Sequence, residues 1–456
     1  MKYIYTITIL FQLFYWSSDL KAQCPISKYG LIPVWPQGWT NADKNNWYQL
    51  MRSKGNGLTQ LNFTWAEADS IINAGQLSTY VNYISILKAA YDLKFHLSIK
   101  NPSTGVNYVP PAYAGMNFKD TVFTNAYFQF AKTLINSFAN VTDYLSVGVE
   151  ADIYFNNHPN ELAGFADLFN NISNYVDASH PNIKISSAVT FENGIVLNDT
   201  LWQLTKKYSD NLCITYWPIN NDFTVKSTAV SDIASNINTL IQKSETKPII
   251  IKECGFPSST ITNSSDSMQA DFLKEMFLQT MNKSEIEGLE WQFLADFDSA
   301  TVNYWVNFYQ YNTPEFIGYI SSLGFMDTLG TAKPVYNIFL QMMDSVCSVT
   351  DIDQNEIYNF PDEFKLFQNY PNPFNPGTTI SWQSPVGSYL TIKIFDVLGK
   401  ELDTIVDGYY EAGSHSASYI VNPALPSGVY FYQLKISDQS IKSSQNLISK
   451  KMILIR

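Results

Sequence analysis

The chain has 456 residues, a length that exceeds one ordinary domain and suits a large barrel followed by a small module. Lys and Arg number 29 against 41 Asp and Glu, and the net charge of −12 argues against binding to nucleic acid or to anionic membranes. Hydrophobic residues make up 45%, which excludes global disorder. Two arginines and four scattered histidines provide neither an arginine clamp for phosphate nor a zinc-ligand set, so we expect no metal and no cofactor.

Residues 1–22 have the pattern of a secretory signal peptide. Lys2 precedes an uncharged, mostly apolar run, Tyr3–Trp16, and a short polar stretch then leads to Ala22. The run is shorter than the roughly 20 residues that a membrane-spanning helix needs. We therefore predict cleavage after Ala22, no transmembrane segment in the mature chain, and a protein that is secreted or attached to the outer cell surface.

The cysteines fit an exported chain. Cys24 and Cys347 bracket the long region that follows the signal peptide. A closed barrel brings its first and last elements together, and export supplies oxidising conditions, so we predict a disulfide between these two residues. Cys213 and Cys254 lie inside apolar runs and are expected to be buried thiols or a neighbouring pair.

Residues 23–343 alternate short apolar runs with amphipathic stretches. The predicted strands are Leu31–Trp35, Leu58–Thr64, Lys94–Ile99, Tyr144–Glu150, Ile183–Thr190, Leu212–Tyr216, Pro248–Glu253 and Leu289–Phe293. The predicted helices between and after them include Ala66–Ala74, Val81–Ala90, Thr124–Phe138, Glu161–Val176, Ser231–Gln242, Asp266–Met281 and Pro334–Met343. Eight strands, each followed by a helix, predict an α/β fold of the (β/α)₈ (TIM) barrel type, whose active site lies at the carboxyl ends of the strands.

Two of these strand ends carry a glutamate. In the fourth strand, alternation places Ser146, Gly148 and Glu150 toward the lumen, with Val147 and Val149 toward the helices. In the seventh strand, alternation places Glu253 on the same side as Ile249 and Ile251. A charge at the end of a buried apolar strand is costly unless it is used or paired, for example with Lys252. We expect both carboxylates at one mouth, about 5 Å apart.

Aromatic residues follow several other strand ends. Flat indole faces suit the C–H faces of sugars. Core packing is the better explanation for any single tryptophan, but the set as a whole favours a carbohydrate groove. The candidate substrate-binding residues at the mouth are Trp35, Trp39, Asn62, Trp65, His96, Trp217 and Trp291. Paired carboxylates with an aromatic groove predict a glycoside hydrolase, in which one carboxyl protonates the leaving oxygen and the other attacks the anomeric carbon. No glycine-rich phosphate loop follows the first strand.

The barrel region resembles the clan A glycoside hydrolases, retaining enzymes built on (β/α)₈ barrels. The segments that carry the resemblance are "YLSVGVEAD", "ITYWP", "PIIIKECGFPS" and "LGFMDTLGTAKPVYNIF". The resemblance implies Glu150 as acid/base, Glu253 as nucleophile, Tyr216 in contact with the nucleophile, and Trp291 beneath the sugar. The family usually has Asn where Val149 stands, and an arginine near Asn62.

Three functions stay open for this barrel. The first is a retaining, endo-acting hydrolase of β-linked polysaccharide. The second is a non-catalytic carbohydrate-binding protein on a hydrolase-like barrel, and the third is a structural or adhesive surface protein. Release of reducing ends separates the first from the other two, and glycan binding separates the second from the third.

The chain changes character after residue 343. Residues 344–363 are acidic and weakly patterned, as in a linker. Residues 364–456 contain short alternating runs, among them Thr379–Trp382, Leu390–Phe395, Gly428–Ile436 and Leu447–Ile455. Turn residues separate these runs, so we predict a small all-β, immunoglobulin-like sandwich.

This last segment resembles the C-terminal sorting domain of the type IX secretion system. The motifs are Tyr-Pro-Asn-Pro-Phe-Asn-Pro at 370–376, "IFDVLGKEL", "LPSGVYFYQL" and the terminal "SKKMILIR". The resemblance implies export by that machinery as a partner, followed by surface attachment or release.

Overall fold

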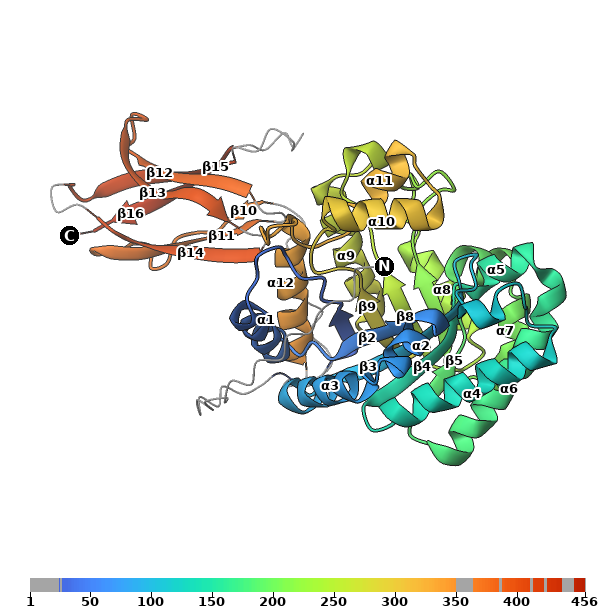
Figure 1. Cartoon of the computed structure of the whole chain (residues 1–456). Helices are drawn as coiled ribbons and strands as arrows, with labels where there is room; N and C mark the ends of the chain where they lie inside the picture. The colour runs from blue at the N-terminus through green and yellow to red at the C-terminus, as the bar shows by residue number, and fades with distance from the viewer. Residues whose placement is uncertain are drawn as a thin grey trace.

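The computed structural model describes residues 24, 27–349, 364–384, 388–410, 413–421, 425–436 and 447–455. The predicted signal peptide lies outside these residues, as does the linker from residue 350 onward. Within the described part, the chain forms a barrel of parallel strands ringed by helices and a separate set of antiparallel strands (Figure 1).

The barrel has eight strand positions, as predicted, although its first strand lies at Tyr29–Leu31, whereas Leu31–Trp35 was expected. Its strands are β1 (Tyr29–Leu31), β2 (Leu58–Phe63), β3 (Lys94–Ser103), β4 (Thr142–Val149), β5 (Lys184–Ser186), β6 (Ala188–Thr190), β7 (Leu212–Tyr216), β8 (Ile249–Cys254) and β9 (Ile286–Trp291). All pairs are parallel, in the orders β2-β3-β4-β5 and β1-β9-β8-β7-β6. The fifth position is split at Ser187, where β5 pairs with β4 and β6 pairs with β7, and this joins the two sheets.

Helices follow and connect the strands of the barrel region. They are α1 (Asn41–Ser53), α2 (Trp65–Asn73), α3 (Leu77–Tyr91), α4 (Thr121–Phe138), α5 (Ala151–Asn157), α6 (Leu162–Ser179), α7 (Thr200–Thr205), α8 (Ile233–Lys243), α9 (Asp266–Thr280), α10 (Ser299–Tyr309), α11 (Pro314–Ile320) and α12 (Pro334–Val349). Side-chain caps fix several helix starts, since Thr40 and Thr64 each form a capping box with an acidic residue. The last helix continues to Val349, so residues 344–349 are helical where we expected linker.

Two apolar layers hold the barrel together. Inward-facing residues form a small lumen cluster: Leu58, Tyr144, Val149, Ala188, Cys213 and Ile250. Outward-facing strand residues such as Ile249 and Ile251 belong to the large cluster between the strands and the helices. Burial on both faces explains why these strands are nearly continuous apolar runs in the sequence.

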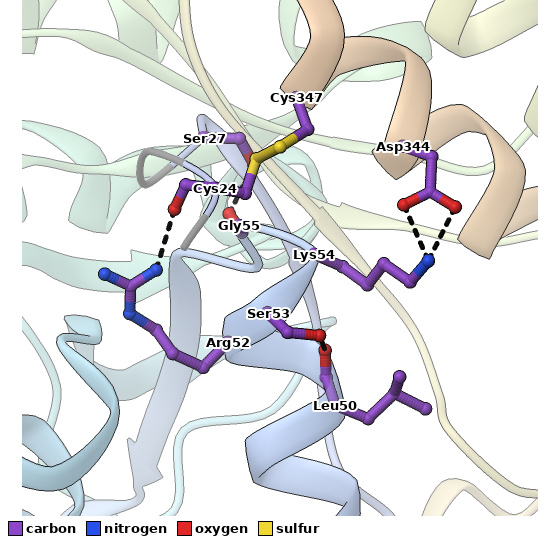
Figure 2. Close-up of a disulfide and its surroundings, with 9 residues drawn as sticks. All are labelled: Cys24, Ser27, Leu50, Arg52, Ser53, Lys54, Gly55, Asp344 and Cys347. Atoms are coloured by element: carbon purple, nitrogen blue, oxygen red, sulfur yellow. Dashed lines mark hydrogen bonds and ion pairs between the residues drawn. A yellow bond between two sulfur atoms is a disulfide. The ribbon is translucent and has the colours of Figure 1, made fainter. Parts of the chain in front are cut away.

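The predicted disulfide between Cys24 and Cys347 is confirmed. Figure 2 shows Cys24, ahead of the first strand, bonded to Cys347 near the end of α12, with the two Cα atoms 5.3 Å apart. Arg52 donates to the Cys24 carbonyl at 2.8 Å, and the Lys54 ammonium lies 2.5 Å from the Asp344 carboxylate. These contacts join the two ends of the barrel chain. Cys213 and Cys254 are buried free thiols.

The α10–α11 pair, which the sequence did not predict, lies between β9 and α12 and stands apart from the ring of helices (Figure 1). It has an apolar cluster of its own, made of Val302, Val306, Phe316 and Ile320. We call residues 299–320 the α10–α11 hairpin.

The C-terminal region is the predicted all-β domain. One sheet has the order β10-β11-β14 and the other β13-β12-β15-β16. The strands are β10 (Lys365–Leu366), β11 (Gly377–Ser384), β12 (Ser388–Phe395), β13 (Glu401–Tyr410), β14 (Gly413–Ile420), β15 (Gly428–Ile436) and β16 (Leu447–Leu454). The predicted runs did not include β10, β13 and β14. In β13 most side chains are exposed or half-buried, so the apolar alternation is weak.

Candidate active site

Glu150 lies directly after β4 and begins α5. Its backbone is left-handed, with φ 52° and ψ 36°, and Gly148 two residues earlier also has a positive φ of 79°. These turns break the alternation that we expected: Val149 joins the lumen cluster, and a Cβ at Gly148 would meet Phe165 of α6. A left-handed backbone costs a non-glycine residue roughly 1–2 kcal/mol, so the contacts of Glu150 must stabilise this conformation.

The carboxylate of Glu150 is held by two neutral hydroxyl groups. Thr104, from the loop after β3, donates to Oε2 at 2.7 Å, and Thr215 of β7 donates to Oε1 at 2.9 Å. No cation forms an ion pair with Glu150 among the described residues. Burial and the nearby negative charge of Glu253 raise the pKa of Glu150.

Glu253 reaches the same mouth by a different local geometry. An extra residue bulges β8, because Ile214 and Thr215 of β7 pair with Ile251 and Glu253 and skip Lys252. Ile249 and Ile251 therefore face the helices, whereas Lys252 and Glu253 both turn toward the inside of the barrel. This corrects the expectation that Glu253 shares a face with the two isoleucines.

Two ammonium groups hold the Glu253 carboxylate. Lys252 lies 2.8 Å from Oε1, and Lys100 of β3 lies 3.2 Å from the same oxygen. Lys252 is fully buried and also donates to the side-chain oxygens of Gln60 and Asn62, at 3.0 and 3.3 Å. Burial opposes ionisation of Glu253, but the two ammonium groups outweigh it and hold its pKa well below the ordinary value.

The α10–α11 hairpin contributes two tyrosines that sequence reasoning missed. Tyr309 and Tyr319 both lie close enough to Glu150 and Glu253 for the carboxylates to raise their pKa further, after the larger effect of burial. Tyr309 is also hydrogen-bonded to Thr104, which itself donates to Glu150. Nothing in the spacing of these tyrosines connects them with strand ends more than 50 residues earlier in the chain.

Four of the residues expected at the mouth lie elsewhere. Tyr216 alternates with the inward-facing Thr215, so its ring stacks on Phe272 of α9 and its hydroxyl accepts from Asn236 of α8. Its expected contact with Glu253 is therefore wrong. Because neighbouring residues of a strand face opposite sides, the sequence itself places Thr215 and Tyr216 on opposite faces of β7. The residue that faces the site is Thr215.

Trp65, Trp291 and His96 are the other three. Trp65 stacks on Tyr113 and lies in the helix layer, and Trp291 stacks on Phe277 of α9. Both indoles are almost fully buried, so neither offers a platform to a sugar. His96 does face inward, but it lies within the barrel with both ring nitrogens engaged, by Glu290 at 2.8 Å and Ser146 at 2.7 Å.

The remaining candidates retain access to solvent. Asn62 is exposed, and its side-chain oxygen, like that of Gln60, accepts a hydrogen bond from Lys252. Trp217 is half-buried, lies against Gly255 directly after β8, and meets Tyr319 edge-on at 5.8 Å. Trp35 and Trp39 are half-buried in one aromatic group, with ring centroids 6.0 Å apart. Their role as sugar-binding residues stays a prediction.

Comparisons with known proteins separate the two regions of the chain. Residues 368–453 match the family model of the secretion system C-terminal sorting domain. The prediction of a sorting domain is confirmed, and the chain is a secreted or outer-surface protein. No curated protein matches the sequence. Within the described ranges, no helix has the length and apolar character required to cross a membrane.

Solved structures similar to this chain include glycoside hydrolases of family 5. A GH5_18 protein from Bifidobacterium longum subsp. infantis aligns over 71% of this chain and 79% of its own, with 13% identity and a TM-score of 0.54. A Streptomyces cattleya GH5_18 variant, in complex with Manβ1-4GlcNAc, aligns over 72% and 82%, with 14% identity and a TM-score of 0.56. An exo-β-1,4-mannosidase from Opitutaceae bacterium strain TAV5 aligns over 77% and 64%, with 17% identity and a TM-score of 0.54. These likenesses show that the fold is the (β/α)₈ barrel of those enzymes.

Proposed function

We propose that this protein is a secreted or surface-attached retaining glycoside hydrolase that cleaves β-linked glycans with Glu150 and Glu253. One observation carries the proposal: two equally buried glutamates at the ends of β4 and β8 have opposite protonation preferences. Each residue is 8% exposed, yet the pKa of Glu150 is raised and that of Glu253 is lowered. Such a divided pair is what a double-displacement mechanism needs.

In the first step, the ionised Glu253 attacks the anomeric carbon. A bond forms between its carboxylate oxygen and that carbon, while the bond to the leaving oxygen breaks and Glu150 donates its proton to that oxygen. In the second step, Glu150, now ionised, removes a proton from water, which displaces Glu253 and restores both residues. Lys100 and Lys252 keep Glu253 charged, and the two threonine hydroxyls orient Glu150.

The family neighbours suggest the first substrates to try. β-Mannosides come first, because one neighbour is an exo-β-1,4-mannosidase and another binds Manβ1-4GlcNAc. β-Glucosides and β-galactosides follow in the same panel. Turnover of 4-nitrophenyl β-glycosides by the full chain tests the activity, and retention of configuration at the anomeric carbon, followed by NMR, tests the double displacement.

The roles of the two residues are separable. Glu253→Ala should abolish turnover of every substrate. Glu150→Ala should still form the glycosyl-enzyme from an activated aryl glycoside, whose leaving group needs no proton, and azide should rescue it with retained configuration. Glu192→Gln serves as the control, since Glu192 forms an ion pair with Lys226 and is not one of the residues that hold the carboxylates of Glu150 and Glu253. Unchanged hydrolysis by Glu150→Ala would refute the assignment.

A second function is favoured by one residue. Val149 lies inside the barrel directly before Glu150, and its side chain offers no hydrogen bond to a sugar hydroxyl. A carbohydrate-binding or adhesive protein on the same barrel would bind glycans without releasing reducing ends. Glycan binding by a wild-type chain that hydrolyses no substrate in the panel would establish this second function.

A further inference from the structure

The α10–α11 hairpin covers the catalytic pair. It brings Tyr309 from the end of α10 and Tyr319 from the end of α11 to the two carboxylates. Glu150 and Glu253 are each only 8% exposed, and Tyr309 and Tyr319 are among the side chains that lie close to them. The hairpin therefore belongs to the site, although it is not one of the eight strand-and-helix units of the barrel.

On one side, the hairpin is fixed to the loop that follows β3. Phe308 of α10 stacks on Tyr108 of that loop, with ring centroids 4.4 Å apart and planes inclined by 22°. The next residue, Tyr309, is hydrogen-bonded to Thr104 of the same loop. These contacts tie the hairpin to the segment that also holds the carboxylate of Glu150.

On the other side, the hairpin is fixed to the loop that follows β7. Phe223 of that loop contacts Phe316 at 4.8 Å and Tyr319 at 5.7 Å, and Tyr319 meets Trp217 at 5.8 Å. Phe223 thereby extends the hairpin's own apolar cluster into the barrel loops. The hairpin is thus attached on two sides of the mouth, with the carboxylates between the attachments.

A bridge attached at both sides restricts how a sugar chain can enter. Cleavage within a polysaccharide requires sugar units to continue on both sides of the scissile bond, so an internal segment must settle sideways into an open groove. A bridged mouth prevents this sideways entry and admits a chain only by its end. We propose that the α10–α11 hairpin makes this a chain-end site, one that removes terminal residues and does not cut internal linkages. The proposal rests on the proposed function and replaces the endo-action expected from the sequence.

The test compares the products from defined oligosaccharides. The full chain is incubated with the 4-nitrophenyl glycoside that it hydrolyses and with the matching β-1,4-linked hexasaccharide, for example mannohexaose, labelled at its reducing end. We expect one short unlabelled product of a single length at early times. We also expect the rate to fall at least tenfold when the 4- and 6-hydroxyls of the non-reducing end are blocked by a benzylidene group.

The two proposals fail in different ways. Early release of unlabelled products of several lengths, or undiminished cleavage of the blocked hexasaccharide, would overturn the chain-end inference and leave the glycosidase assignment intact. Absence of turnover on every aryl glycoside and oligosaccharide would overturn the proposed function, and the chain-end inference with it.

Variants test whether the hairpin is responsible. Phe308→Ala removes the stack on Tyr108, and Phe223→Ala removes the attachment on the opposite side. Each should increase internal cleavage relative to terminal cleavage at least fivefold, with circular dichroism confirming a folded chain. Asn303→Ala, at an exposed position of α10, is the matched control and should leave the product pattern unchanged. An unchanged pattern in both folded phenylalanine variants would overturn the role of the hairpin.

Discussion

Glu150 and Glu253 are the same residue type with the same exposed fraction, yet their surroundings shift their pKa values in opposite directions. Two threonine hydroxyls hold Glu150, and two ammonium groups hold Glu253. Because burial is equal, the difference in pKa must come from the neighbouring groups. The comparison shows that a barrel mouth can shift the pKa values of two equally buried carboxylates in opposite directions by the choice of two neighbours for each. Four predictions test it.

The largest expected effect follows from removing the charged member of the pair. Glu253→Gln should lower kcat/KM by at least about 10⁴-fold, because loss of a nucleophile in a hydrolase costs that much or more. Steady-state kinetics on the aryl glycoside measures it, with Glu192→Gln as the control. A loss below tenfold would mean that Glu253 is not the nucleophile.

The second prediction concerns the source of the Glu253 charge. Lys252→Met should raise the pKa of Glu253 by about 1–3 pH units, since an opposite charge at this distance has an effect of that size. A carboxylate nucleophile must be ionised, so the acid limb of the kcat/KM profile should move to higher pH. Because the pKa of Glu253 starts at about 2, activity at pH 5 should fall by at most about twofold, whereas activity at pH 3 should fall by about 2- to 100-fold. The pH–rate profile measures the shift.

Two further variants control for folding. Lys100→Met should move the same limb in the same direction. Because the Lys100 side chain is partly exposed, this variant disturbs the core less than Lys252→Met does. Lys184→Met removes a lysine that pairs with Glu287 and should leave the profile in place. An acid limb that stays fixed in both Lys100→Met and Lys252→Met would contradict the assignment by ammonium neighbours.

The third prediction concerns folding stability. Because the pKa of Glu150 is raised in the folded state, the unfolded chain loses this proton at lower pH than the folded chain does. The stability contributed by protonated Glu150 is fully present below its unfolded value and is lost as the pH rises through the folded value. Wild type should lose about 1.4 kcal/mol relative to Glu150→Gln for each pH unit between the two values.

Denaturant unfolding of both chains at pH 4 and pH 8 measures this difference. Glu253→Gln should show the opposite pH dependence of stability relative to wild type. The pKa of Glu253 is lowered, so its contribution is present above the unfolded value and is lost as the pH falls toward the folded value. If the two variants change in the same direction with pH, the carboxylates do not differ as described.

The smallest expected effect comes from removing one of the two threonine hydroxyls that donate to Glu150. Thr215→Val removes a hydroxyl that stabilises the ionised form of Glu150, so the pKa of Glu150 should rise further. The alkaline limb of kcat/KM should then move to higher pH by less than about one unit, with a change in rate of a few-fold. Thr142→Val removes a hydroxyl at the other end of β4 and is the control. A large loss of activity in Thr215→Val would show that this residue does more than tune the acid.

The sequence predicts the architecture well because architecture depends on local pattern. All eight barrel positions and the two glutamates follow from apolar periodicity and strand ends. The orientation of the side chains near those strand ends does not follow from periodicity. The bulge at Lys252 and the positive φ of Gly148 each break the alternation from which we predicted it. The hairpin tyrosines were missed because their place at the site depends on tertiary packing.

The bond between Cys24 and Cys347 makes the barrel chain a covalent ring with two tails. It joins residues 323 apart in sequence, so the first strand and α12 cannot fray independently of each other. If the chain is cleaved after Ala22, as expected, the mature protein begins one residue ahead of this junction. Any cut that removes the sorting domain beyond residue 349 falls outside the ring. Cleavage at both of these places therefore leaves the first strand and α12 covalently joined. Reduction of the disulfide would separate them.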